Sequence, residues 1–204
     1  RNFRNEGISI KHNPEFTMME VYQAYADMEV MMNLTEELVT TIARSLAPDL
    51  KTPFGDKTID LSQPWKRVRM VDAVREATGS ADLDFNSPRE KAAEIAKAQH
   101  VAIEAKDSSA AIIVKIFEAK VEGTLLNPTF IYEYPREISP LAKQTAHDPD
   151  RVDRFELFIN GWEMANAFSE LNDPEEQRRR FEDQIKQKET GDEEAHCMDA
   201  DYVN

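Results

Sequence analysis

The sequence predicts an acidic α+β domain, and three stretches of it carry that prediction. Residues 28–47 repeat apolar side chains every three to four positions, which is the spacing of an amphipathic helix. Residues 129–134 form a short apolar and aromatic run closed by Pro135, which is typical of a strand. Residues 154–171 place Asn160 and Gly161 between two apolar runs, and this pair favours a hairpin because both residues tolerate positive φ.

The first part of the chain predicts a strand that leads into the long helix. Residues 15–24 are rich in aromatic and branched side chains, and alternation along a strand places Phe16, Glu20 and Tyr22 on one face. A carboxylate on an apolar face needs a partner, which for Glu20 is either a structural arginine or a cationic ligand. The helix is expected to bury one stripe: Met31, Leu34, Leu38, Ile42 and Leu46.

The middle of the chain predicts shorter elements. Residues 58–61 and 65–69 have the composition of short strands. Residues 87–90 (SPRE) resemble a helix start, with a capping serine, a proline at the first position and a glutamate three residues after the cap. That helix is expected to run toward residue 99, and a further helix is expected over residues 108–126.

The predicted hairpin brings two carboxylates onto one face of the sheet. With a two-residue turn, Ile159 faces Trp162 and Phe158 faces Glu163, so Glu156 lies diagonally from Glu163. Such diagonal neighbours are roughly 7–8 Å apart at Cα, and both carboxylates could reach one hard cation. The alternative is a solvated sheet face without any ligand.

The composition excludes several classes of function. The formal net charge is −14, because 25 Lys and Arg stand against 39 Asp and Glu in 204 residues. Gripping nucleic-acid phosphates depends on clustered Lys and Arg, so this stretch alone is not expected to do so. The sequence contains no run of about 18 apolar residues, so it predicts no membrane-spanning helix. The single cysteine, Cys197, cannot form an internal disulfide and favours a reducing, cytoplasmic setting.

Common catalytic motifs are also absent from the sequence. The chain has six glycines and no glycine-rich phosphate loop, serine nucleophile elbow, cysteine pair or HExxH zinc motif. His12 lies in a loop-like stretch, where an exposed histidine without a role is the default interpretation. The chain begins at Arg1 with no signal-peptide pattern, and we expect it to be an internal segment of a longer protein.

Separated motifs, in the right order, resemble class II aminoacyl-tRNA synthetases, and the bacterial-type lysine-specific enzymes in particular. FRNEGIS, two further residues and HNPEFTMME, over residues 3–20, resemble the second signature motif of that family. The other matching strings are PTF (128–130), EYP (133–135), ISPLA (138–142), DRFE (153–156) and NAFSELND (166–173). The resemblance implies the family's catalytic core, an antiparallel sheet flanked by helices, in incomplete form.

The resemblance also implies a role for particular residues. Arg4 would stabilise the α-phosphate of ATP, for which a permanently charged fork of donors is suited. The implied ATP-binding residues are Arg4, Glu6, His12, Asn13 and Phe16. The implied lysine-binding residues are Glu20, Tyr22, Asn166, Phe168 and Glu170. Glu156 and Glu163 would carry Mg²⁺. For the metal and lysine pockets to adjoin, a β-bulge is expected near Ala165.

The function that the resemblance implies is that of a lysine–tRNA ligase. Such an enzyme activates L-lysine with ATP and transfers it to the 3′ end of tRNA(Lys), in the cytoplasm and as a homodimer. The family's first and third motifs and its anticodon-binding barrel have no counterpart in residues 1–204, so we expect this chain alone to be inactive.

Three alternatives remain at this stage. A related ligase modifies elongation factor P with a lysine-like amino acid, and a synthetase-like binding module would have no catalytic activity. An aspartate-specific relative is disfavoured, because its pocket should offer a cation where this chain has Glu20 and Glu170.

Overall fold

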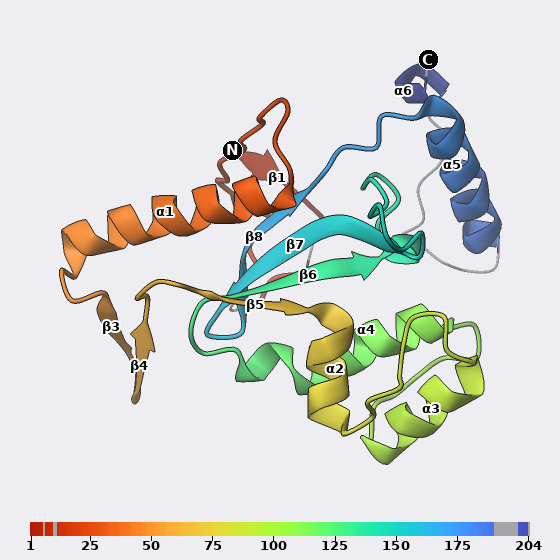
Figure 1. Cartoon of the computed structure of the whole chain (residues 1–204), viewed down its shortest axis with the longest axis horizontal. Coiled ribbons are helices and arrows are strands. Elements are labelled where there is room, and N and C mark those ends of the chain that lie inside the picture. Colours follow the sequence, from red (N-terminus) through yellow and green to blue (C-terminus); the bar gives the residue numbers. More distant parts are fainter. Residues whose placement is uncertain (6, 10–11, 190–199, 204) are drawn as a thin grey trace.

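The computed structural model describes residues 1–5, 7–9, 12–189 and 200–203, and its centre is a four-stranded sheet (Figure 1). In order across the sheet, the strands are β5 (Lys66–Arg69), β6 (Thr129–Pro135), β7 (Arg151–Ile159) and β8 (Trp162–Phe168). The pairs β6–β7 and β7–β8 are antiparallel, whereas β5 runs parallel to β6. The predicted α+β class is confirmed, with one parallel pair at the edge of the sheet.

Helices cover both faces of the sheet. On one face lie α2 (Met70–Thr78), α3 (Arg89–Ala98) and α4 (Ser109–Lys120), whose apolar side chains form the larger core with Ile131 and Phe158 (Figure 1). On the other face, α1 (Met28–Leu46) packs near Phe130, Phe155 and Leu157. The remaining elements are β1 (Asn2–Phe3), β2 (Glu15–Phe16), β3 (Lys51–Phe54), β4 (Lys57–Asp60), η1 (Glu122–Thr124), η2 (Arg136–Ile138), α5 (Pro174–Glu189) and α6 (Ala200–Val203).

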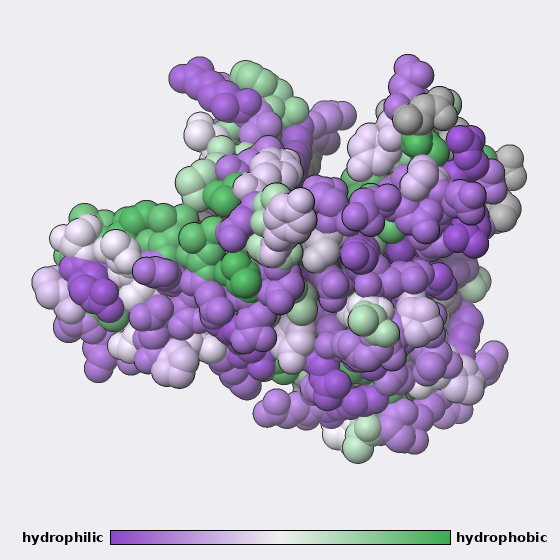
Figure 2. Space-filling view, turned by 45° about the horizontal axis from the view of Figure 1, so that its top comes forward, coloured by the Kyte–Doolittle hydropathy of each residue, from purple (hydrophilic) through white to green (hydrophobic). Residues whose placement is uncertain are grey.

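Helix α1 confirms the predicted helix, but it buries a different face from the predicted one. Its buried residues are Met32, Glu36 and Thr40, which follow one another at intervals of one helical turn. Ile42 and Leu46 of the predicted stripe are 55% and 82% exposed. Figure 2 shows a hydrophobic band on the surface over α1. Its residues are the exposed large apolar residues of this helix: Val30, Leu34, Ile42 and Leu46.

A buried ion pair determines which face of α1 turns inward. The Glu36 carboxylate accepts hydrogen bonds from the Trp65 backbone N–H and from the Arg67 guanidinium, each at 3.1 Å. A carboxylate taken out of water needs such partners. The helix is therefore anchored through a polar residue, which apolar periodicity alone assigns to the surface.

The start of the chain differs from the predicted long strand. β1 and β2 form a separate two-stranded sheet, and the strand predicted over residues 15–24 is wrong beyond Phe16. Residues 17–24 pair with no other strand in the described part of the chain, so the backbone ladder that defines a strand does not form there. The short strands predicted at 58–61 and 65–69 are confirmed, each within one residue, as β4 and β5.

The predicted helix starts are confirmed in one case and corrected in the other. Ser108 caps α4, because its Oγ accepts from the Ala111 N–H at 3.1 Å, although α4 ends at Lys120 and not near residue 126. Ser87 does not cap α3: its Oγ accepts from the Asp84 N–H at 2.8 Å and so stabilises the preceding turn.

The β7–β8 turn forms as the sequence predicts. Asn160 and Gly161 have φ values of 54° and 68°, and Ile159 pairs with Trp162 across the turn. The Asn160 and Gly161 N–H groups donate to the carbonyl groups of residues 126 and 125, both at 2.9 Å. The turn is therefore fixed against the segment that follows α4.

The predicted bulge is confirmed in β8, beside Ala165. Phe158 pairs with Glu163, whereas the preceding residue Leu157 pairs with Ala165. Met164 is thus the extra residue of the bulge, and every side chain after it changes face relative to an unbroken strand.

Candidate active site

The bulge in β8 collects polar side chains of two strands on one face of the sheet. Asn166 pairs directly with Glu156, and Phe168 pairs with Arg154. Glu163 follows on the same face, two pairs closer to the turn. Without the bulge, Glu163 and Asn166 would point to opposite faces, because they lie three residues apart. The structure therefore brings the two predicted metal ligands together with two predicted lysine-binding residues.

Glu156 is the buried centre of this face, at 9% exposure. Its Oε2 accepts from the Tyr134 hydroxyl at 2.7 Å, and its Oε1 accepts from Arg154 at 2.6 Å and from the Asn166 amide at 3.4 Å. Burial raises the pKa of Glu156 and the charge of Glu163 raises it further, against the opposing effect of Arg154. Glu163 therefore lies close enough to Glu156 for the charges of the two carboxylates to interact.

The sequence predicted no role for three residues of this site, which are Arg154, Tyr134 and Ser139. Arg154 donates to Ser139 Oγ at 2.9 Å and to Asn166 Oδ1 at 3.2 Å, and its Cζ lies 4.6 Å from the centre of the Tyr134 ring. Burial, followed by the charge of Glu156, raises the pKa of Tyr134 well above its usual value, so the hydroxyl remains a donor. One signal was available for Arg154, because strand alternation places it on the Glu156 face.

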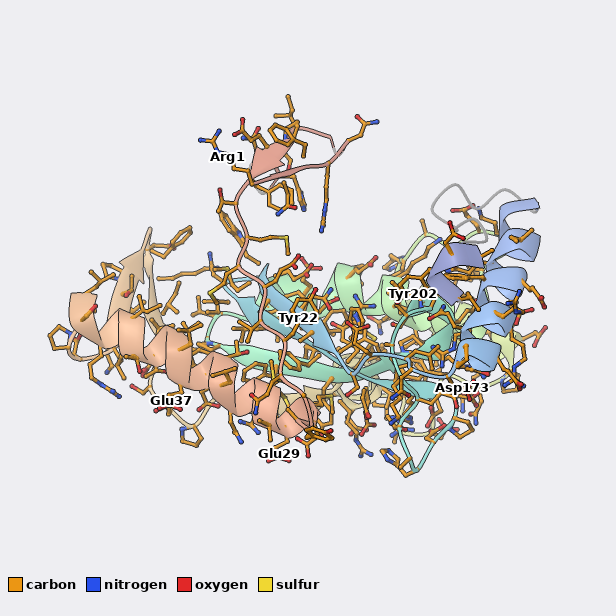
Figure 3. All side chains as sticks on the ribbon, turned by 90° about the horizontal axis from the view of Figure 1, so that it is seen from above. Arg1, Tyr22, Glu29, Glu37, Asp173 and Tyr202 are labelled. Carbon is orange, nitrogen blue, oxygen red and sulfur yellow. The ribbon has the colours of Figure 1, made fainter. Side chains whose placement is uncertain are left out.

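The other predicted lysine-binding residues, Glu20, Tyr22 and Glu170, form a second group of oxygen-bearing side chains. The Tyr22 hydroxyl donates to Glu20 Oε2 at 3.2 Å. The charge of Glu20 raises the pKa of Tyr22, and Glu170 adds to this effect, so Glu170 lies within electrostatic reach of Tyr22. Figure 3 shows Tyr22 over the sheet, on the segment that leads into α1. The structural arginine considered for Glu20 is not found among the described residues.

The predicted ATP-binding residues that the structure describes lie on the β1–β2 hairpin. The guanidinium carbon of Arg4 lies 5.3 Å from the centre of the Phe16 ring. His12 Nδ1 lies 3.1 Å from Ser9 Oγ, and the Asn13 amide donates to a backbone carbonyl of the hairpin at 2.9 Å. These contacts shape the loop internally and leave His12 exposed, so that it faces solvent.

Two parts of the predicted site are not joined in this structure. The β1–β2 hairpin, which begins at Arg1, projects away from the four-stranded sheet in Figure 3. Glu6, the remaining predicted ATP-binding residue, lies outside the described residues. Among the described residues, the structure thus keeps the hairpin part of the predicted site apart from the part that lies on the sheet.

The pair Glu156 and Glu163 is compatible with Mg²⁺. No group of three or more His, Cys, Asp or Glu residues suited to a metal occurs in the described part of the chain. Mg²⁺, however, commonly uses one or two protein carboxylates and takes its other ligands from phosphates and water. A carboxylate pair whose charges repel fits that donor set.

The fold and the carboxylate-rich hairpin define the class of protein. The chain matches the family described as tRNA synthetases class II (D, K and N) over residues 1–204, and it belongs to that family. The resemblance noted in the motifs is therefore confirmed over the whole chain.

Relatives that match this chain along its whole length are lysine–tRNA ligases. The chain is 51% identical to the lysine–tRNA ligase of Carboxydothermus hydrogenoformans, 54% to that of Bacillus subtilis and 52% to that of Staphylococcus epidermidis. Each match covers 100% of this chain but 40–41% of the relative, so the chain spans about two fifths of their length. These names favour lysine–tRNA ligase over the ligase that modifies elongation factor P. In the described residues, no helix has the length and apolar character that crossing a bilayer requires.

Proposed function

We propose that the chain is the central part of the catalytic domain of a lysine–tRNA ligase, from the second signature motif through the metal-binding hairpin. The observation that carries this proposal is the identity of 51–54% with lysine–tRNA ligases along the entire chain. The first and third motifs and the anticodon-binding barrel would belong to other parts of the full-length protein.

The proposed reaction begins with activation of lysine. A carboxylate oxygen of lysine attacks the α-phosphorus of ATP, the bond to pyrophosphate breaks, and lysyl-adenylate forms. Arg4 stabilises the charge that builds up on the α-phosphate, while Glu6, His12, Asn13 and Phe16 hold the nucleotide. No covalent enzyme intermediate is needed, so the protein acts by positioning and by charge stabilisation. A hydroxyl of the 3′-terminal ribose of tRNA(Lys) then attacks the lysyl carbonyl, the bond to AMP breaks, and lysyl-tRNA forms as AMP leaves.

The lysine side chain would be recognised by charge. The negative charges of Glu20 and Glu170 both raise the pKa of Tyr22. The positive charge of a substrate ammonium group would balance the charge of these two carboxylates. Asn166 and Phe168, which the bulge directs to the same face as Glu156, would complete the pocket. An acidic substrate such as aspartate would be repelled by this set, which gives discrimination as well as affinity.

Glu156 and Glu163 would hold Mg²⁺, which when bound neutralises phosphate charge. Their contribution is a carboxylate pair on one sheet face, with Glu156 fixed by Tyr134 and Arg154. We further propose that the full-length protein acts as a cytoplasmic homodimer, as the resemblance implies.

Lysine-dependent exchange of pyrophosphate into ATP by the full-length protein tests this function. We expect exchange that requires lysine and that falls by about 100-fold or more in Arg4→Ala and in Glu163→Ala. Arg4→Ala removes the cation proposed to face the α-phosphate, and Glu163→Ala removes one of the two carboxylates proposed to hold Mg²⁺. Glu37→Ala, an exposed position on α1, is the control and should retain full exchange. The isolated 204-residue chain should show none. A folded full-length protein that gives no exchange with lysine would contradict the proposal.

A further inference from the structure

Arg154 is the side chain that joins the metal-binding and lysine-binding residues of the proposed site. Its Nη2 donates to Glu156 Oε1 at 2.6 Å, its Nε to Asn166 Oδ1 at 3.2 Å and its Nη1 to Ser139 Oγ at 2.9 Å. The guanidinium also stacks on Tyr134, whose hydroxyl donates to the other oxygen of Glu156. All three guanidinium nitrogens are therefore used, on three different elements of the fold.

We propose that Arg154 is a positioning residue, which orients the Asn166 amide and the Glu156 carboxylate for the binding of the amino-acid substrate. This inference rests on the proposed function and adds to it a residue to which the family motifs assigned no role. Arg154 acts through Asn166 and Glu156, and does not itself contact the substrate.

The orientation of the Asn166 amide follows from the chemistry of Arg154. A guanidinium only donates hydrogen bonds, so the amide oxygen must turn toward Arg154 and the NH₂ group away from it. One amide N–H then reaches Glu156 Oε1 at 3.4 Å, and the other is left for an acceptor in the pocket. Asn166 is thereby presented as a donor, which suits the carboxylate of an amino acid.

The position requires arginine in particular. A planar fork can meet a carboxylate, an amide oxygen and a hydroxyl at once, whereas a lysine ammonium is a single point from which donors radiate. Arg154→Lys should therefore keep the ion pair with Glu156 and lose the contact that orients Asn166. The conservative substitution separates positioning from charge.

Steady-state kinetics of the full-length protein in a double-mutant cycle test this role. We expect Arg154→Lys to raise the KM for lysine by about 10-fold, with a smaller change in kcat, as is typical when a supporting hydrogen bond behind a binding residue is lost. In an Asn166→Ala background the same substitution should have little further effect, because Arg154 would act through a side chain that is already absent. Arg179→Lys, an exposed arginine on α5, is the matched control and should leave both constants unchanged.

The outcomes separate this inference from the proposed function. Absence of lysine-dependent exchange in the wild-type protein would defeat the proposed function. An active wild-type protein, with an unchanged KM in Arg154→Lys or with additive effects in the double variant, would overturn the role of Arg154 alone. If Arg154→Lys fails to fold, Ser139→Ala replaces it in the cycle. That variant removes one acceptor of the guanidinium, and an unchanged KM or additive effects would again overturn the inference.

Discussion

Glu156 and Glu163 show how a single residue on β8 changes the ionisation of one on β7. Glu163→Gln should lower the pKa of Glu156 toward its ordinary value, because one of the two causes of its elevation is removed. When folding raises the pKa of a carboxyl group, the free energy of unfolding falls as the pH rises through that pKa. The substitution should therefore raise the free energy of unfolding at pH 7, by less than about 1 kcal/mol.

Carboxyl ¹³C NMR titration of Glu156, together with urea denaturation at pH 7, would measure both effects. Glu175→Gln, on the exposed first turn of α5, serves as the control. An unchanged pKa of Glu156 in Glu163→Gln would mean that the two carboxylates do not share a site. Mg²⁺ binding should also weaken as the pH falls through the pKa of Glu156, because the metal requires the carboxylate form.

At the residue scale, the sequence predicted the groups that a motif names and missed those that packing recruits. Glu156 and Asn166 follow from the motif strings, and their direct pairing follows from the predicted turn and bulge. Tyr134 and Ser139 reach the same carboxylate network from β6 and from the end of η2. No local spacing links those positions to β7, so only the completed sheet could reveal them.

At the scale of elements, the turn between β7 and β8 is held in a conformation and a place that only glycine suits. Gly161 has φ +68°, and a Cβ there would lie 3.2 Å from the Glu122 carbonyl oxygen and 3.2 Å from Gly123 Cα. Gly55 has a similar φ of +63° in the β3–β4 turn, with nothing within 4 Å. Gly55→Ala should cost about 1 kcal/mol from backbone strain alone, and Gly161→Ala should cost more than about 2 kcal/mol. Urea denaturation would measure the difference, and equal losses would show that the contact with η1 is unimportant.

The anchoring of α1 gives a second prediction for an element. Glu36→Ala should reduce the free energy of unfolding by about 2 kcal/mol, because it leaves the Trp65 N–H and Arg67 without their buried acceptor. Glu37→Ala, on the neighbouring exposed position, should change it by less than about 0.5 kcal/mol. Hydrogen exchange of residues 28–46 would show whether α1 loosens first. Similar protection in both variants would contradict the anchoring role.

The elements also show where prediction from sequence stops. The turn at Asn160 and Gly161 was predictable because a local pair of residues determines it. The strand over residues 15–24 was not, because a strand exists only when another segment supplies its hydrogen bonds. The buried face of α1 was likewise set by a distant partner, Arg67, and not by the apolar spacing within the helix.

On the scale of the whole molecule, the hydrophobic band on α1 should limit the solubility of the isolated chain (Figure 2). Ile42→Glu and Leu46→Glu should increase the solubility of the isolated chain while changing its free energy of unfolding by less than about 0.5 kcal/mol, because both side chains are already exposed. Light scattering against concentration, with Thr41→Glu on the exposed polar side as the control, would measure the effect. A large loss of stability in either variant would mean that these side chains are packed after all.

The bulge at Met164 allows the side chain at this position to be tested separately from the backbone. Its side chain is 57% exposed, so a library of substitutions at Met164 should be widely tolerated. Deletion of the same residue would leave Glu163 and Asn166 two residues apart, so both would stay on one face of an unbroken strand, and only the bend and added twist of the bulge would be lost. Selection on the full-length protein should therefore accept most replacements of Met164. Rejection of its removal would show that the site depends on the bend of β8 as well as on the shared face.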